Sequence, residues 1–168
     1  MKRLYLLRHA KSSWKDTSLP DHDRPLAGRG RRATQAITRY LREQGIEPEL
    51  VLCSTARRAR ETLEGIEPAL GTAALCLEDD LYAAGAPDLL ERLRSVPDDV
   101  ESVMLIGHNP GLHELALGLA RPSSTASELA VKYPTGALAI LVFSASTWHA
   151  LDYDTAELVD LLRPRDLE

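Results

Sequence analysis

The chain alternates short apolar runs with segments in which apolar residues recur every three or four positions. The runs at 3–7, 49–54 and 102–107 predict buried strands, and a weaker run at 74–77 predicts a fourth strand. Because helical patterns lie between these runs, successive strands are expected to be joined by helical crossovers and to run parallel. The pattern therefore predicts an α/β fold with a mostly parallel central sheet and helices on both of its faces.

Four helices are predicted from the same periodicity and from their end signals. The first ends at Gly45, the second ends before Pro68, the third begins near Pro87, and Asn109-Pro110 opens the fourth. Each lies between two apolar runs or directly after one. This placement is typical of the crossover helices of a parallel sheet.

The pattern changes after a loop rich in proline and serine at 121–127. The apolar segments 136–143 and 148–153 predict two strands joined by a short turn, and we expect these strands to pair antiparallel. A last short helix is predicted near 154–162. The chain shows no repeat, low-complexity tract or linker, so residues 1–168 are predicted to form a single domain.

Composition and charge limit the binding partners and the cellular compartment that we expect for this protein. The 168 residues are 44% hydrophobic and 27% charged, with a formal charge of −5, so neither nucleic acid nor a membrane surface is an expected partner. The four-residue apolar run before Arg8 is too short for a signal peptide, and no stretch has the length of a membrane span. We interpret Cys53 and Cys76 as two buried, reduced thiols rather than a disulfide, and we expect a cytoplasmic protein.

Unusual residues follow three of the predicted parallel strands. The first strand ends in Arg8-His9, the second is followed by Arg57 at the start of a helix, and the third is followed by His108. Because ligands of open α/β sheets bind beyond the carboxyl ends of the strands, these side chains are expected to converge. The helix N-termini beside them favour anions.

Two histidines and two arginines suit phosphoryl transfer. Arginine binds phosphate oxygens with a planar fork that keeps its charge, and a neutral imidazole can attack phosphorus. Taken one at a time, each residue has a structural interpretation as well. A single loop histidine is usually hydrogen-bonded and structural, and Arg57 in "RRAR" would lie on a solvated helix face. The agreement of three strand ends favours the functional interpretation.

Four segments resemble the motifs of the histidine phosphatase superfamily, in the order found in that family. They are "LYLLRHAKS", "DRPLAGRGRRAT", "CSTARRARETLE" and "LIGHNPGL", and a late "PTGALAI" adds a resemblance to its small SixA-type phosphohistidine phosphatases. The resemblance covers nearly the whole chain. It implies a phosphoglycerate mutase-like fold, His9 as a nucleophile that forms a phosphohistidine, and Arg8, Arg57 and His108 around the phosphate. It implies no metal and no other cofactor.

Position 10 and the proton donor depart from the family pattern, and several residues near the motifs are further candidates. Position 10 is Ala where the family has Gly. Among the acids of "LEDDLYAAG", Asp80 is the candidate proton donor, and a solvated loop is the alternative. Lys11, Ser12 and Arg24 are candidate phosphate or rim contacts.

The sequence leaves four functions to compare. The first is a metal-independent phosphatase that acts on phosphohistidine in a protein partner, and the second acts on small phosphate esters by the same mechanism. The third is a phosphate-binding module without catalysis. The fourth is a metal hydrolase using His9, His22 and His108, which the two neighbouring arginines disfavour because they would repel a cation. The shortness of the chain leaves little room for a lid, which favours the protein substrate.

Overall fold

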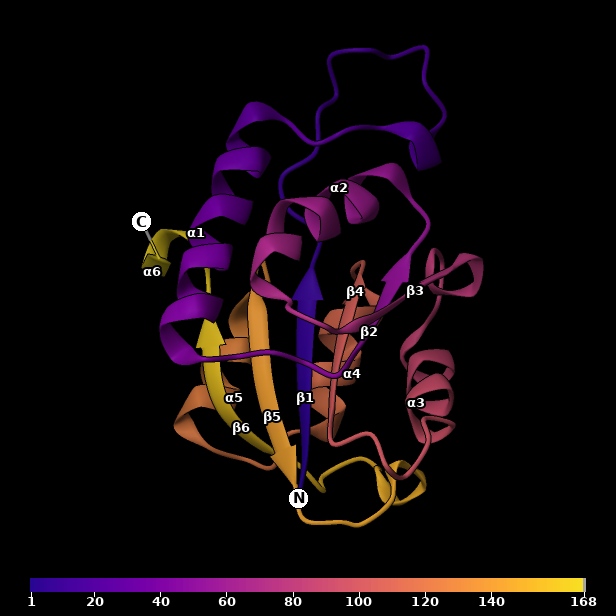
Figure 1. Ribbon diagram of the computed structural model, residues 1–168, viewed down its shortest axis with the longest axis vertical. Helices are drawn as coiled ribbons and strands as arrows, with labels where there is room; N and C mark the ends of the chain where they lie inside the picture. The colour runs from indigo at the N-terminus through magenta and orange to yellow at the C-terminus, as the bar shows by residue number, and fades with distance from the viewer. Residues whose placement is uncertain (168) are drawn as a thin grey trace.

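The computed structural model describes residues 1–167, which form one sheet covered on both faces by helices (Figure 1). Within these residues the sheet has six strands in the order β3-β2-β4-β1-β5-β6. The strands are β1 (Lys2–Arg8), β2 (Leu50–Ser54), β3 (Ala74–Glu78), β4 (Ser102–Gly107), β5 (Leu138–Phe143) and β6 (Glu157–Leu162). The helices are α1 (Gly28–Gln44), α2 (Arg57–Ile66), α3 (Ala86–Arg94), α4 (Gly111–Leu119), α5 (Ser124–Val131) and α6 (Pro164–Leu167).

The pairing of the strands confirms the predicted mostly parallel sheet. β1 pairs in parallel with β4, and β2 pairs in parallel with both β3 and β4. β5 is antiparallel to β1 and to β6. The carboxyl ends of β1, β2, β3, β4 and β6 therefore meet the amino end of β5 along one border of the sheet. We call this border the carboxyl edge.

Alternation along β1 divides the core into two layers. Leu4 and Leu6 pack with α3 and α4 on one face, whereas Tyr5 and Leu7 pack with α1 and α2 on the other. Figure 1 shows α1 and α2 on the near face of the sheet. α1 ends at Gly45, which has a positive φ of 65°, as its glycine predicted.

The predictions for the C-terminal third were partly wrong. Residues 148–153 form no strand: a 3-10 turn, Trp148–Ala150, lies there, with Trp148 fully buried against Phe143 and its indole N–H donating to the Val100 carbonyl. The residues predicted as a last helix instead form β6, which is the true antiparallel partner of β5. The second strand thus begins nine residues later along the chain than predicted, at Glu157 rather than Trp148.

The segment 121–127, predicted as a loop, contains the start of α5. Ser123 caps this helix by accepting a hydrogen bond from the backbone N–H of Ala126 at 3.0 Å. A serine at a helix N-terminus is a recognised start signal. Because the neighbouring serines and proline are equally typical of a loop, the sequence pattern did not distinguish the two.

The two cysteines are free thiols on opposite faces of the sheet. Cys53 is buried in the α1–α2 layer, and burial raises the pKa of its thiol to about 12. Cys76 packs against the α3–α4 layer and is half-buried, so its predicted full burial was wrong. It lies on β3, which forms an exposed border of the sheet.

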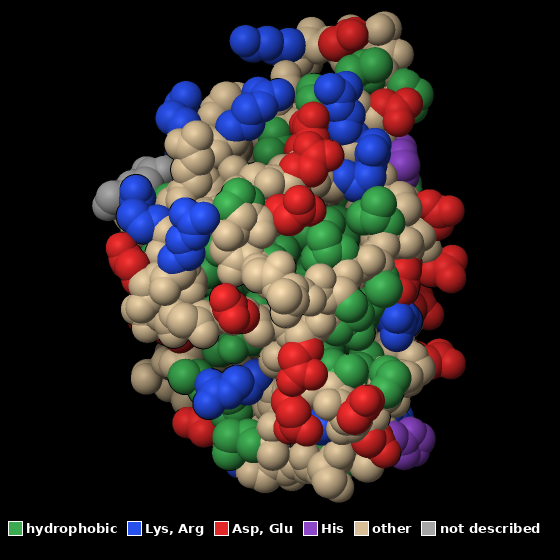
Figure 2. Space-filling view, in the orientation of Figure 1, with side chains coloured by type: hydrophobic (Ala, Val, Ile, Leu, Met, Phe, Trp, Pro, Cys, Tyr) green, Lys and Arg blue, Asp and Glu red, His purple; other side chains and the backbone are tan. Residues whose placement is uncertain are grey.

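Charge is distributed unevenly over the surface. Figure 2 shows most of the visible lysine and arginine side chains over the upper part of the molecule, where α1 and the loop before it lie, with carboxylates both among them and over the lower part. No helix among residues 1–167 combines the length and the apolarity that crossing a membrane requires.

Candidate active site

His9 is the first residue beyond β1. Three contacts hold the backbone from His9 to Lys11 in place. Its N–H donates to the Gly107 carbonyl at 3.0 Å, which extends the β1–β4 pairing by one residue. The N–H of Ala10 donates to Thr62 Oγ1 in α2 at 2.9 Å. On the other side, α1 approaches so closely that a Cβ on Gly30 would lie 2.2 Å from the Lys11 carbonyl oxygen. The loop after β1 is therefore held between α1 and α2.

The hydrogen bonds of His9 determine its protonation state. Its Nδ1 lies 2.8 Å from the Ala10 carbonyl oxygen, and because a carbonyl only accepts, Nδ1 carries the proton. Burial lowers the pKa of His9 to about 3, although the bond to Ala10 opposes this and the charges of His108, Arg58 and Arg8 add to it. The ring is thus neutral at pH 7, with an unprotonated Nε2 that is free to act as a nucleophile.

His108 faces His9 from the end of β4. The two ring centroids are 5.1 Å apart and the rings are tilted by 49°. His108 Nε2 lies 2.8 Å from the hydroxyl of Ser54, the last residue of β2. Burial, followed by the charge of Arg58, lowers the pKa of His108 to about 4. When the Ser54 hydroxyl donates to Nε2 of this neutral ring, the proton of His108 lies on Nδ1.

Two guanidinium groups flank the histidine pair. Arg58 in α2 is 7% exposed and donates to the carbonyl of Asp21 at 2.8 Å and to its carboxylate at 3.0 Å. Arg8, at the end of β1, donates through Nη1 to the Tyr133 carbonyl at 3.1 Å. The charges of both arginines lower the pKa values of both histidines. The histidines therefore stay neutral in a positively charged surrounding.

Arg57, predicted in this position, lies outside the cluster. Its side chain is 43% exposed and pairs with Glu61 one turn along α2, at 3.3 Å. Successive helix positions are about 100° apart, so Arg58 faces inward when Arg57 faces out. The spacing contained this information: Arg58 shares the face of the buried residues Thr62 and Ile66, four and eight positions on. The exposure of Arg57 and its ion pair with Glu61 fit the structural interpretation, a solvated helix face.

Polar atoms without partners gather at this site. Within residues 1–167, four buried side-chain nitrogen or oxygen atoms have no hydrogen-bond partner: Arg8 Nε, Arg58 Nε, His108 Nδ1 and Asn109 Oδ1. Three of the four are nitrogens of the residues around His9. Buried polar groups are normally satisfied, so a cluster of nitrogens that can donate indicates a site for an anion with several acceptor oxygens.

The comparisons with known proteins agree with this geometry. The sequence profile of the histidine phosphatase superfamily (branch 1) matches residues 4–82. A protein of Mycobacterium tuberculosis (strain CDC 1551 / Oshkosh) is 37% identical over 165 residues, which is 95% of this chain and 100% of that protein. A SixA-type protein of Nakamurella multipartitia is 31% identical, covers 97% of this chain and 96% of that chain, and has a TM-score of 0.86.

The chain belongs to the histidine phosphatase superfamily. A further neighbour is the protein histidine phosphatase SixA complexed with tungstate, which is 22% identical, covers 99% of both chains and has a TM-score of 0.80. Together these similarities make the protein a SixA-like phosphatase with the phosphoglycerate mutase-like fold.

Sequence reasoning missed a network beside the histidine pair of this phosphatase. The Tyr82 hydroxyl donates to Asp21, whose carboxylate also accepts from Arg24 and Arg58. These bonds, the one from Tyr82 first, hold the pKa of Asp21 far below its usual range. The Tyr82 ring contacts His108 edge-on, with centroids 5.6 Å apart. The network therefore fixes Arg58 and one wall of the site.

His22 lies at the border of this wall. Its ring packs edge-on against Tyr82 at 4.7 Å, and its Nε2 lies 3.1 Å from the Thr55 hydroxyl. The metal-hydrolase hypothesis used His9, His22 and His108. Among residues 1–167, no group of three His, Cys, Asp or Glu side chains is arranged to hold a metal ion.

The three candidate rim residues contact other partners. Arg24 is buried, donates to Ser12 Oγ at 2.8 Å and lies 3.5 Å from the ring centroid of Trp14. Arg24 and Ser12 thus brace the loop between β1 and α1. Lys11 is exposed and lines a different cavity, described below.

Asp80, the candidate proton donor, is exposed and lies on the side of the molecule formed by β3 and α3. The acid that reaches toward the site from this segment is Asp79, which accepts from the Thr55 hydroxyl at 2.6 Å. Among the described residues, no carboxylate is hydrogen-bonded to His9 or His108. Position 10 causes no disruption, since Ala10 is fully buried against Leu26 and Ala33.

Proposed function

We propose that this phosphatase removes the phosphoryl group from phosphohistidine in a protein partner, through a covalent phosphohistidine at His9 and without a metal ion. The observation that carries the proposal is the bond from His9 Nδ1 to the Ala10 carbonyl. It leaves Nε2 as the unprotonated nitrogen and directs the nucleophile to one defined position.

In the first step, the lone pair of His9 Nε2 attacks phosphorus and the bond between phosphorus and the leaving nitrogen breaks. In the second step, the oxygen of a water molecule attacks phosphorus, the bond between phosphorus and His9 Nε2 breaks, and inorganic phosphate leaves as Nε2 recovers its lone pair. Both transition states carry negative charge on the equatorial phosphoryl oxygens. Arg8, Arg58 and His108 present unpartnered nitrogens that suit these oxygens.

The leaving group decides which substrate the site suits. An alkoxide leaving group needs a strong proton donor, whereas an imidazole nitrogen has a pKa of about 6.5 and accepts a proton from solvent near neutral pH. Within residues 1–167, no carboxylate hydrogen-bonds either histidine. This supports an N–P substrate over the alkyl phosphate esters of the alternative hypothesis.

The relatives support the same choice. The SixA neighbours are named as phosphohistidine phosphatases, and one of them is complexed with tungstate, a tetrahedral oxyanion resembling phosphate. A neutral imidazole surrounded by arginines is suited to such an ion. The non-catalytic hypothesis leaves the unprotonated Nε2 of His9 without a purpose.

The test is a comparison of substrates. The pure protein is incubated with a histidine-phosphotransfer protein carrying labelled phosphohistidine, with free phosphohistidine, and with a panel of alkyl phosphate esters. We expect rapid loss of label from the phosphoprotein and at least about 10²-fold lower kcat/KM for the esters, which need protonation of a worse leaving group. Preferred hydrolysis of an ester would replace the proposed substrate class, and His9→Ala provides the inactive control.

A further inference from the structure

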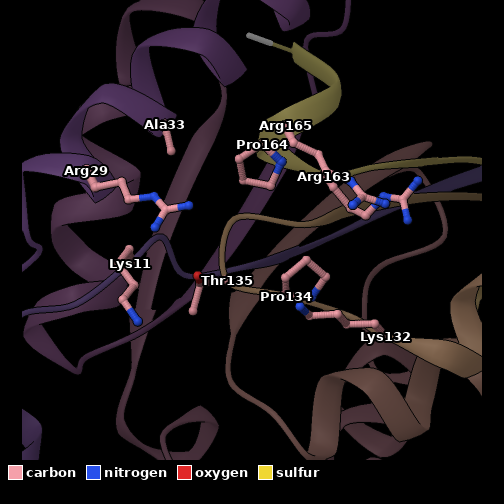
Figure 3. A pocket seen from close by; sticks show the side chains of 9 residues that line it. All are labelled: Lys11, Arg29, Ala33, Lys132, Pro134, Thr135, Arg163, Pro164 and Arg165. Carbon is pink, nitrogen blue, oxygen red and sulfur yellow. The ribbon is translucent and has the colours of Figure 1, made fainter.

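A cavity beside the catalytic cluster opens on the carboxyl edge, on the side of β5 and β6. It has a volume of 310 Å³ and is shown in Figure 3. We call it the basic pocket; it is lined by Lys11, Arg29, Ala33, Lys132, Pro134, Thr135, Arg163, Pro164 and Arg165. These residues come from the loop after β1, the first turns of α1, the segment before β5 and the chain after β6. Four distant segments thus build one cavity.

The lining is strongly basic in a chain whose overall charge is −5. Five of the nine lining residues are lysine or arginine, and none is acidic. Arg163 is neutralised by Asp166 at 3.1 Å. Within residues 1–167, Lys11, Arg29 and Lys132 have no carboxylate within ion-pair distance. Uncompensated positive charge in a concave site attracts anions.

The basic pocket adjoins the catalytic cluster. Lys11 follows His9 by two residues, a step that spans at most about 7 Å of extended chain. Thr135 precedes Gly136, whose N–H donates to the carbonyls of both Arg8 and His9. The wall between the two sites is therefore the backbone of these two loops.

The walls of the basic pocket are fixed before any ligand binds. Gly136 has a φ of 76°, and a Cβ there would lie 2.8 Å from Pro164 Cγ, so the chain before β5 packs tightly on the chain after β6. Ala33 is buried, and Pro134 and Pro164 restrict the backbone. Figure 3 shows the Arg29 guanidinium extending from α1 toward Thr135 across the cavity. Because the backbone of the pocket is preformed, only its exposed lysine and arginine side chains lose entropy when a ligand binds.

We propose that the basic pocket binds acidic side chains of the phosphorylated protein substrate, close to its phosphohistidine; this rests on the proposed function. A substrate that occupies both sites must extend over the two loops that separate the basic pocket from the catalytic cluster. A polypeptide segment can do so, with its phosphohistidine at His9 and a carboxylate beside Arg29 and Lys132. A compact monophosphate occupies the catalytic cluster alone. The basic pocket therefore favours substrates by the charge of their flanking sequence.

The test uses two phosphohistidine peptides that differ only in their flanks, one with aspartates and glutamates and the other with asparagines and glutamines. Arg29→Glu and Lys132→Glu are compared with Arg39→Glu, which reverses an exposed charge of α1 outside the basic pocket. Free phosphohistidine reports the catalytic cluster alone. Urea unfolding of each variant verifies that its fold is intact.

We expect wild-type protein to prefer the acidic peptide in kcat/KM, and each pocket variant to lose about 5- to 10-fold on that peptide, mainly through KM. The preference should weaken in high salt, and hydrolysis of free phosphohistidine should stay unchanged. An equal loss of kcat/KM on the acidic peptide in Arg39→Glu would overturn this inference but leave the proposed function standing. The absence of any preference between the two peptides in wild-type protein would do the same. Wild-type protein that hydrolyses neither peptide nor free phosphohistidine would overturn the proposed function and the inference with it.

Discussion

The catalytic cluster and the basic pocket adjoin on one edge of the sheet, yet they hold their charges in opposite ways. In the cluster, Arg58 is buried and fixed by Asp21, and His9 is buried and neutral. In the basic pocket, Lys11 and Arg29 are exposed, with no carboxylate in ion-pair distance among residues 1–167. The charges of the cluster are buried and protected from salt. The charges of the basic pocket are exposed to solvent and to dissolved ions.

This difference determines how each site responds to change. Buried charge-assisted hydrogen bonds are strong, and loss of one partner leaves a group unsatisfied. Exposed charges are screened and contribute little individually. Substitutions in the cluster should therefore change turnover strongly, whereas those in the basic pocket should change affinity modestly and with salt.

The largest contrast is between two adjacent arginines. Arg58→Ala should lower kcat/KM by about 10²–10³, the usual loss when one stabiliser of transition-state charge is removed. Arg57→Ala should stay within about twofold of wild type, because its partner is Glu61 on the surface. Steady-state kinetics of the two variants decides between them. The opposite order would return Arg57 to the cluster and remove Arg58 from it.

A second substitution tests how the cluster orients His108. Ser54→Ala removes the hydroxyl 2.8 Å from His108 Nε2, and we expect about 10-fold lower kcat with little change in KM, since the ring loses the bond that sets its tautomer. Ser54→Thr keeps a hydroxyl and should recover part of the loss. An unchanged kcat in Ser54→Ala would show that His108 is oriented by its packing.

Stability should depend on pH through the two buried histidines of the cluster. Folding lowers the pKa of His9 to about 3 and that of His108 to about 4, from 6.5. As pH falls below 6.5, the unfolded chain takes up protons that the folded state refuses, so the free energy of unfolding falls. The loss approaches about 1.4 kcal/mol per pH unit for each histidine, until the folded pKa is reached.

Urea unfolding between pH 6.5 and 4.5 measures this slope. His9→Gln should have a shallower slope than wild type, and His149→Gln, which removes an exposed histidine, should keep the wild-type slope. Identical slopes in all three proteins would contradict the buried, neutral state of His9.

The smallest effect is expected at Asp80. Asp80→Asn should leave kcat/KM for phosphohistidine within about twofold of wild type, because the side chain is exposed on the β3–α3 side. A loss of tenfold or more, measured across pH 5 to 8, would identify Asp80 as a proton donor after all.

The parallel part of the fold and the histidine pair were predictable, because strand ends and helix signals lie close together in the sequence. Arg8 ends β1, and His9 and His108 directly follow β1 and β4, so the sheet alone brings these residues to one edge. The inward orientation of Arg58 was also predictable, because its spacing of four residues from Thr62 places it on the buried face of α2.

Other features depend on packing between distant segments. The buried Trp148 replaces a predicted strand by a turn, which shifts the last strand to β6. Tyr82 and Asp21 meet although 61 residues separate them, and the basic pocket needs four segments to close. Local patterns carry no information about such contacts.

The central claim is that the phosphoryl group passes through His9. The most direct measurement is rapid quenching of the enzyme during turnover of labelled phosphoprotein, followed by identification of the labelled residue. The account predicts label on His9 that is lost in acid and retained in base, as expected of a phosphoramidate, with no label in His9→Ala and unchanged labelling in the presence of chelator. Label on another residue, or full labelling and turnover in His9→Ala, would contradict it.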